Sequence, residues 1–256
     1  MKRFILSIVQ ALLIPGLIHL PTAWCDSNRF QESYYYPAIE SVGFIRRDTV
    51  PVAGTIHSSA QNQVMIAWNH VVYFKPHRDH VFKKDELYVV FQKANEVFYD
   101  DISKGFYYQI KGVVKITAMK SRFIQGVIVK SYLPVRKGDL LKPYKQINPN
   151  IPITKEAPYI RAHVIESAET KRMVSQGDLV FIDKGDIHGI RPGNLFKIFE
   201  HQERDFELSR RTVFLDASRD YPSGRLLILT TDRETAAGLI VWSKNELLMA
   251  HQLDVH

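Results

Sequence analysis

Cysteine is almost absent from this sequence: Cys25 is the only one among 256 residues. A single cysteine excludes an intramolecular disulfide framework and any metal site that needs several thiolate ligands. Runs of five or more Lys or Arg are absent too, and no nucleic-acid-binding motif accompanies the net charge of +7. The mild positive charge therefore favours anionic partners other than nucleic acid, namely acidic proteins, lipid headgroups or anionic wall polymers.

The signature motifs of the common enzyme classes are also missing. The sequence contains no G-x-S-x-G turn, no H-E-x-x-H pair, no P-loop and no dinucleotide-binding fingerprint. The chemistry of those classes needs these residues at these spacings. We therefore predict a protein that is not an enzyme and that holds no cofactor.

No long hydrophobic run follows the first 20 residues. Lys2 and Arg3 precede the apolar stretch 4–20, which polar residues, a proline and a glycine interrupt. A charged start, a short broken apolar run and a polar continuation are typical of a secretory signal peptide. We predict that residues 1–25 are removed and that the mature chain lies in the periplasm. An uncleaved membrane anchor is the alternative.

Cys25 itself allows two interpretations. A lipoprotein signal needs an aliphatic residue three positions before the cysteine and a small residue directly before it. Thr22 and Trp24 occupy those positions, and Trp24 is a poor match. Loss of Cys25 with the signal peptide is favoured, and a lipid anchor on Cys25 is the second interpretation.

The rest of the chain has the pattern of a mainly β protein. Short runs rich in β-branched and aromatic residues are separated by Gly, Pro, Asp and Asn, which is typical of strands and turns. No stretch of a dozen residues shows helical periodicity, so we expect little helix. The clearest predicted strands are 64–68, 71–74, 87–91, 107–119 and 123–130.

The second half of the chain repeats the first, at an offset of 162 − 54 = 108 to 224 − 112 = 112 residues. The matched segments, in chain order, are 54–58 with 162–166, 83–91 with 191–199, 112–117 with 224–229 and 126–129 with 238–241. Two unrelated all-β stretches also align loosely, but four ordered matches at a nearly constant offset favour a duplication. We predict two tandem, related modules of small β-barrel or sandwich type.

These patterns divide the chain into five segments. They are a signal peptide at 1–25, an N-terminal arm at 26–50, a first β module at 51–145, a linker at 146–156 and a second β module at 157–254. The region of the linker is rich in proline and asparagine, which favours an extended connector over a strand or a helix.

Three glycines stand directly before an Asp or Asn at the start of a predicted strand: Gly138, Gly177 and Gly193. Glycine adopts positive φ without the steric cost that a Cβ imposes. We therefore predict tight turns that lead into buried strands at these positions. Such residues indicate architecture and carry no chemistry.

Two segments resemble a tandem module of known envelope proteins. The first reads QGVIVKSY followed by VRKGDLLKP, and the second reads QGDLVFIDKG followed by GIRPGNLF. These motifs resemble the C-terminal tandem module of LysM-containing envelope proteins, the group of the TsaP-type secretin-associated proteins. The C-terminal part is also similar to the C-terminal domain of FlgT-type flagellar ring proteins. The resemblance covers about residues 37–253, and the glycan-binding LysM domain of that family is missing.

One histidine-rich segment is a candidate metal site. His70, His77 and His80 lie within eleven residues, with Asp79 beside the last. Histidines three residues apart can hold a metal ion. The segment is polar, however, and its basic residues oppose a cation, so a solvated loop is favoured.

A second cluster joins Asp183, Asp186 and His188, and turn-forming aspartates explain it at least as well as a metal or catalytic site. Trp68 and the tyrosines at 107–108 have faces that stack on sugars or bases. In a strand-rich chain such aromatics more often fill the core or pair across strands. We therefore assign no catalytic, cofactor-binding or metal-binding residue.

The resemblance implies a periplasmic partner of an outer-membrane ring. We expect a non-catalytic structural or accessory subunit of a pilus secretin, a flagellar ring or a secretion-system core, associated with the outer membrane. Its partners would be proteins of that complex, with no nucleic acid and no transmembrane segment after signal removal. The alternatives are a protein that binds peptidoglycan or another cell-wall glycan, and a periplasmic hydrolase that uses a carboxylate cluster.

Overall fold

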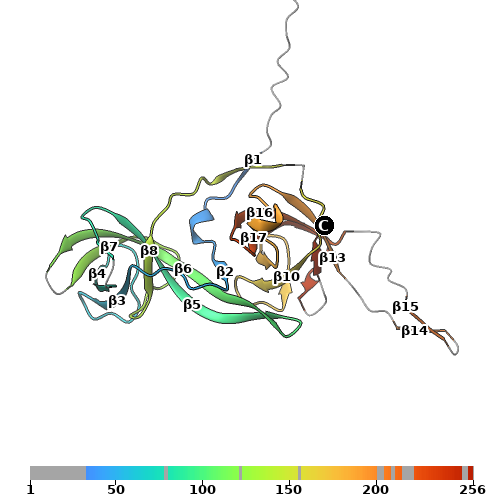
Figure 1. Ribbon diagram of the computed structural model, residues 1–256, viewed down its shortest axis with the longest axis horizontal. Coiled ribbons are helices and arrows are strands. Elements are labelled where there is room, and N and C mark those ends of the chain that lie inside the picture. The colour runs from blue at the N-terminus through green and yellow to red at the C-terminus, as the bar shows by residue number, and fades with distance from the viewer. Residues whose placement is uncertain are drawn as a thin grey trace, which may run out of the picture. The chain divides into compact units, whose positions relative to one another are not determined.

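The computed structural model describes residues 33–77, 80–120, 123–154, 157–200 and 222–249, and the backbone of three further strands at 205–208, 211–214 and 253–255. Strands dominate these residues, which confirms the predicted mainly β fold (Figure 1). Their only helical elements are two short 3-10 helices, η1 (Ile39–Ser41) and η2 (Asp186–His188). In this part of the chain no helix is long and apolar enough to cross a membrane. The predicted signal peptide and Cys25 lie outside the described residues.

An antiparallel sheet of seven strands holds the first half of the chain, in the order β2-β6-β5-β8-β3-β4-β7. Its strands are β2 (Phe44–Arg46), β3 (Gly54–Ser59), β4 (Val71–Pro76), β5 (Leu87–Tyr99), β6 (Ile102–Met119), β7 (Ile124–Ser131) and β8 (Leu140–Pro143). A further pairing joins β6 to β7. With this pairing, six of the strands form a curled ring in the order β3-β4-β7-β6-β5-β8, and β8 pairs with β3 again. We call this ring the first barrel.

A closed barrel holds the second half, in the order β10-β12-β17-β16-β13-β19, and we call it the second barrel. Its strands are β10 (Ala162–Ser167), β12 (Leu179–Ile182), β13 (Leu195–Glu200), β16 (Gly224–Thr231), β17 (Ala236–Ser243) and β19 (Leu253–Val255). Three two-stranded sheets accompany the barrels: β1 (Ser33–Tyr35) with β9 (Asn150–Pro152), β11 (Met173–Val174) with β18 (Leu247–Leu248), and β14 (Asp205–Leu208) with β15 (Arg211–Phe214).

The two barrels have the same strand order. We number the six strands of each barrel from 1 to 6 in chain order. Neighbouring strands around both rings then follow the order 1-2-5-4-3-6. The four sequence matches of the repeat fall on equivalent strands, namely β3 with β10, β5 with β13, β6 with β16 and β7 with β17. A shared strand order, with the sequence matches on equivalent strands, is what a duplication predicts. The chain therefore contains two tandem, related β modules.

Each barrel has its own apolar core because alternate residues of its strands point inward. In β4, for example, Val72 and Phe74 are fully buried while their neighbours Val71 and Tyr73 are only half-buried. The core of the first barrel also includes Ile56, Tyr88, Val90, Val114, Ile116, Ile128 and Leu141. The core of the second barrel includes Val164, Val180, Ile182, Phe196, Ile198, Leu226, Ile228 and Ile240.

The three Gly-Asx turns have the predicted geometry. Gly138, Gly177 and Gly193 have φ angles of 95°, 96° and 93°, which a Cβ disfavours. In each turn the side chain of the following Asp or Asn accepts a hydrogen bond from the backbone N–H three residues before it, at 2.6, 2.8 and 2.7 Å in chain order. The side chain thus closes the turn that leads into β8, β12 or β13.

The predicted strand at 64–68 is wrong. This segment is a loop between β3 and β4 in which only Ile66 pairs with another segment, at Val135. Asn62 and Asn69 turn the chain at positive φ on either side of the loop. Asparagine tolerates that conformation better than most residues do, and two such turns leave too few residues between them for a strand.

The predicted arm and linker are more ordered than expected. The described part of the arm carries β1, η1 and β2, and β2 pairs with β6 at the edge of the first sheet. The linker contains β9, which pairs with β1. Ile151 of β9 is buried, and the burial of this side chain favours a short edge strand that proline composition alone does not predict.

Candidate functional site

A shared apolar core joins the two barrels. Its buried side chains come from the N-terminal region, from β5, β6 and β9, and from four strands of the second barrel, β10, β12, β16 and β17. The first group is Ile39, Val42, Ile45, Val97, Tyr107 and Ile151, and the second is Ile165, Phe181, Leu227, Leu229, Ala237 and Leu239. Removing so many apolar side chains from water stabilises the contact, each by roughly 1.5–3 kcal/mol for a fully buried large side chain. The barrels are therefore joined by a core and not merely by a connector.

The distal part of the β5–β6 hairpin, which Figure 1 labels, has side chains that make polar contacts across the same boundary. The ring of Tyr99 stacks on that of His163 of β10, with centroids 4.7 Å apart. The Tyr107 hydroxyl donates a hydrogen bond to the carbonyl of Ala168 at 3.3 Å. Burial, with smaller contributions from nearby glutamates, raises the pKa of Tyr107 to about 12, so the hydroxyl keeps its proton at neutral pH.

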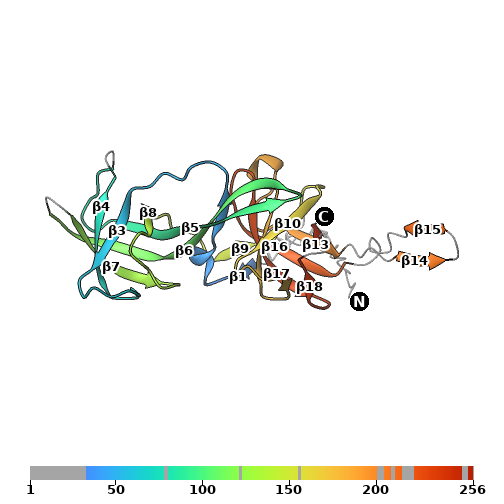
Figure 2. The same ribbon diagram turned by 90° about the horizontal axis from the view of Figure 1, so that it is seen from below.

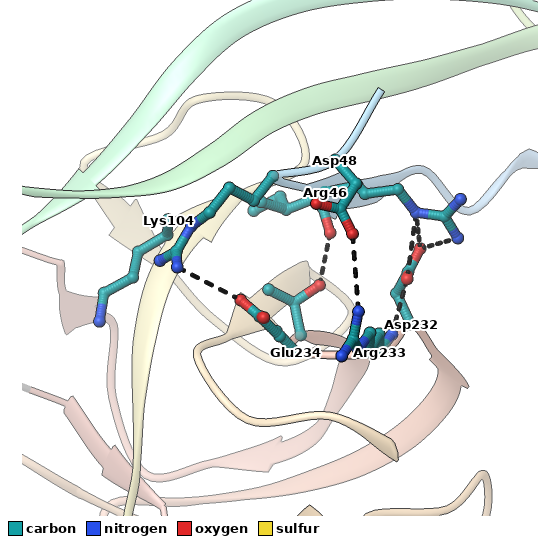
Figure 3. Close-up of a pocket in the computed structure, with 9 residues that line it drawn as sticks. Arg46, Asp48, Lys104, Asp232, Arg233 and Glu234 are labelled. Atoms are coloured by element: carbon teal, nitrogen blue, oxygen red, sulfur yellow. Dashed lines mark hydrogen bonds and ion pairs between the residues drawn. The ribbon is translucent and has the colours of Figure 1, made fainter. Parts of the chain in front are cut away.

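An arginine clamp lies beside this core. Arg46, at the end of β2, points its guanidinium at the carboxylate of Asp232, in the turn between β16 and β17 (Figure 3). The Nε atom lies 3.1 and 2.9 Å from the two carboxylate oxygens, and the second nitrogen lies 2.7 Å from one of them. This is the two-point geometry in which Arg and carboxylate bind most strongly. Asp232 is largely buried, which limits screening by solvent.

Two longer ion pairs continue the clamp. Arg47 lies 3.6 Å from Glu234, and Arg233 lies 3.8 Å from Asp48, as Figure 3 shows. Both pairs are exposed, so each contributes little to stability by itself. We call residues 45–48 together with 232–235 the seam.

Each charged residue of the seam lies beside one of the opposite sign. A cavity of about 240 Å³ lies against it, lined by the seam residues and Lys104. Among the described residues, Lys104 lies 3.7 Å from Asp183, so its ammonium also has an anionic neighbour. A buried hydrogen bond from the Thr235 hydroxyl to the backbone carbonyl of Ile45, at 2.6 Å, joins the two segments directly. This arrangement binds one module to the other in one register.

A second cavity, of about 310 Å³, adjoins the seam and contains Lys142 of β8. The Lys142 ammonium lies 3.9 Å from the centre of the Phe44 ring and 5.7 Å from that of Phe91, in cation–π geometry. Burial, and secondarily the charge of Arg46, lowers the pKa of Lys142 to about 8, against a partial opposing effect of Asp232. The cavity thus holds a cation whose nearest described neighbours are aromatic faces.

Glu40 of η1 organises the other end of this cavity. It accepts hydrogen bonds from Lys130 at 2.5 Å, from Tyr132 at 2.9 Å and from Tyr144. Burial by itself raises the pKa of the Glu40 carboxyl, but these hydrogen bonds outweigh it and lower the pKa. Glu40 therefore stays ionised and joins η1 to β7 and to the segment after β8.

The histidine-rich segment does not come together as a site in the described residues, which exclude Asp79. The His70 ring accepts a hydrogen bond from the Ala67 backbone at 3.1 Å, and His80 contacts the Tyr88 hydroxyl at 2.9 Å. His77 is exposed after the end of β4. Each histidine therefore has separate surroundings.

The cluster at 183–188 is divided among local partners as well. Asp183 accepts hydrogen bonds from the backbone and ring of His163, at 2.8 and 3.1 Å. Burial acts to raise the pKa of Asp183, and the hydrogen bonds from His163 more than offset it, so the pKa is lowered. Asp186 pairs with Arg191, while His188 accepts a hydrogen bond from the backbone of Gly185. Of the singled-out aromatics, Trp68 is exposed and Tyr107 and Tyr108 are buried.

The seam residues were not identified from the sequence. The triplet Arg-Arg-Asp at 46–48 has the opposite net charge to Asp-Arg-Glu at 232–234, but this complementarity does not single the two triplets out. The two triplets stand about 185 residues apart, and short charged triplets are common on protein surfaces. Only the pairing of β2 with β6, together with the position of the β16–β17 turn, brings them together.

Comparison with known proteins assigns the chain to no family. No protein-family model matches the sequence, and no curated protein is significantly similar to it. The shared core and the seam therefore provide the structural basis for a functional proposal.

Proposed function

We propose that this protein is a non-catalytic structural subunit of the periplasm that docks on an outer-membrane ring complex, such as a pilus secretin, a flagellar ring or a secretion-system core. The observation that carries the proposal is the shared apolar core between the barrels, reinforced by the seam. The signal-peptide pattern of residues 1–25 supports export.

A braced pair of barrels suits a structural role for a physical reason. Domains joined only by a linker, or by a small polar contact, move relative to each other by default. Here a contact with a buried core and a two-point arginine clamp opposes such motion. A subunit that bridges two neighbours in a ring needs its contact surfaces at a constant separation, and a rigid pair supplies this.

The test is purification of the tagged full chain from cell membranes, with partners identified by mass spectrometry. We expect a large ring complex to co-purify with the wild type. Arg46→Asp places two carboxylates against each other at the seam, and we expect it to reduce co-purification at least tenfold. The charge-swapped pair Arg46→Asp with Asp232→Arg restores opposite charges and should recover the complex.

Arg191→Asp is the matched control, because it makes the same charge change on an exposed arginine outside the seam. It should leave the complex intact. If the wild type brings down no large assembly, the proposed function is wrong. If Arg46→Asp folds and co-purifies as well as the wild type, rigid coupling of the barrels is not what the partner requires.

A further inference from the structure

Figure 2 labels β3 and β4, and the loop that connects these strands exposes large apolar side chains to solvent. The exposed fractions are 80% for Val64, 60% for Met65 and 67% for Trp68. Leu133, in the segment after β7, is exposed as well. Single exposed apolar residues are common, but three within five positions form an unusual concentration. We call Val64, Met65, Trp68 and Leu133 the apolar tip.

The fold holds the apolar tip in place. Ile66, in the middle of the loop, is 1% exposed and belongs to the core of the first barrel. Its backbone exchanges two hydrogen bonds with Val135, at 2.9 and 2.8 Å. The buried Ile66 therefore acts as an anchor, while the side chains on both sides of it point away from the core. Such a loop displays its apolar residues without having to unfold.

Basic residues flank the apolar tip. The two segments run antiparallel at the bridge between Ile66 and Val135, which brings Arg136 and Lys137 next to the loop, and both are exposed. Neither residues 60–77 nor residues 124–138 contain an Asp or Glu. The surface around the tip thus combines apolar side chains with positive charge.

From this combination we propose that the apolar tip inserts into an anionic lipid surface. Tryptophan favours the boundary between headgroups and hydrocarbon, because its ring is apolar and its N–H needs a polar partner. Exposed lysine and arginine beside it attract anionic headgroups, and the attraction is screened by salt. A protein partner for the tip would have to supply acidic groups around an apolar pocket. A lipid surface supplies both properties at once, so it is the occupant that the tip fits best.

The test uses the full chain with one tryptophan at a time. The sequence has only Trp24, Trp68 and Trp242, so Trp24→Phe with Trp242→Phe leaves Trp68 as the only reporter. Trp24→Phe with Trp68→Phe leaves Trp242, an exposed tryptophan of β17, as the matched control. Each protein is mixed with vesicles of phosphatidylcholine, alone or with phosphatidylglycerol, that carry brominated acyl chains. Bromine quenches only a tryptophan that reaches the chains, so the apolar residues near the N-terminus do not contribute to the signal.

We expect the anionic vesicles to quench Trp68 and shift its emission to the blue, while Trp242 stays unchanged. Arg136→Gln with Lys137→Gln, made in the Trp68-only chain, should weaken the quenching about tenfold or more, and added salt should do the same. Equal quenching of Trp68 and Trp242, or none of Trp68, would overturn the proposal. Quenching of Trp68 that is equally strong with phosphatidylcholine alone would overturn the anionic preference.

A protein partner gives a different result. In that case Val64→Ser, Met65→Ser and Trp68→Ser together would remove a protein from the membrane pull-down, while vesicles would leave Trp68 unquenched. That outcome overturns lipid insertion but not the proposed structural function. If no ring complex co-purifies with the wild type, by contrast, the proposed structural function is contradicted, while the vesicle result is unaffected.

Discussion

The two barrels share one strand order, and each contains a Gly-Asp turn, before β8 in the first and before β12 in the second, but the two aspartates lie in different surroundings. In the first barrel Asp139 follows Gly138 and meets Lys111 of β6 at 2.9 and 3.0 Å, with side-chain exposures of 4% and 5%. In the second barrel Asp178 follows Gly177 and meets Lys171 at 2.7 Å near the surface. The turn itself is identical in kind, with the same backbone hydrogen bond to the carboxylate.

The different surroundings of the two aspartates distinguish the role of this residue type in closing the turn from its role in an ion pair. The Gly-Asp turn needs only positive φ and a short side-chain acceptor, so it recurs wherever a strand has to start sharply. The ion partner is supplied by whichever strand lies beside the turn. The hairpin of β5 and β6 is long in the first barrel and continues toward the second, and its middle brings Lys111 into the interior. The aspartate of one turn is therefore part of a buried polar pair, and the aspartate of the other is not.

The largest expected effect is on the buried pair. Lys111→Met leaves the Asp139 carboxylate buried without its cation, and we expect the free energy of unfolding to fall by about 3–5 kcal/mol. Lys171→Met is the matched change at the solvated pair and should have little effect. Urea denaturation of the full chain measures both.

Adding Asp139→Asn to Lys111→Met sharpens the comparison. It removes the stranded charge but keeps a side-chain oxygen for the backbone of the turn, so part of the lost stability should return. Equal losses for Lys111→Met and Lys171→Met would show that burial does not distinguish the two pairs.

A smaller effect, equal in the two barrels, is expected at the glycines of the turns. A Cβ at Gly138 or Gly177 meets no other atom within 4 Å, so the positive φ alone sets the cost. Gly138→Ala and Gly177→Ala should each lower the free energy of unfolding by about 1–2 kcal/mol. Gly138→Asn and Gly177→Asn should lose less, because asparagine tolerates positive φ better. A large difference between the two barrels in this series would show that the positive φ alone does not set the cost.

The smallest expected effect concerns Lys142, which lies four residues after Gly138. In the second barrel, Phe181 lies at the same distance after Gly177. Phe181 lies in the shared core, whereas Lys142 buries an ammonium against aromatic rings. The pKa of Lys142 is about 8 in the folded chain, below an ordinary value of about 10.4 in the unfolded chain. Between these values the unfolded chain binds more protons, so the stability contributed by this group rises as the pH rises from about 8 to about 10.

Lys142→Met should therefore raise the free energy of unfolding at pH 7 by about 1 kcal/mol and remove the rise with pH. Unfolding curves in urea from pH 7 to pH 10 measure this, with Lys145→Met as the control, since Lys145 is exposed. An unchanged pH profile in Lys142→Met would mean that the ammonium is solvated and the pKa ordinary.

Much of the fold was predictable from local patterns. Strands such as 71–74 and 107–119 have the residue types that a half-buried sheet favours, and the structure places β4 and β6 there. The segment 64–68 has the same composition and forms a loop. Only Ile66 of this segment is buried in the core of the barrel. Residue composition does not distinguish a loop with one buried residue from a strand in which buried and exposed residues alternate.

The seam was beyond local patterns. Arg46 and Asp232 carry no signal of their own, since most charged residues on a surface have no specific partner. Glu40 and Lys142 are likewise ordinary in sequence and unusual only in their surroundings, among tyrosine hydroxyls in one case and aromatic faces in the other. Burial and partner choice depend on residues that are distant along the chain.

The mainly β class, the repeated module and the Gly-Asx turns follow from the amino-acid sequence alone, because strand composition and positive φ are local properties of a few residues. Only the tertiary structure decided that the barrels share a core, that Arg46 clamps Asp232, and that the residues beside Ile66 stay in solvent. Those outcomes depend on which strands lie side by side, and the free energy that selects them comes from burying side chains that the sequence keeps far apart.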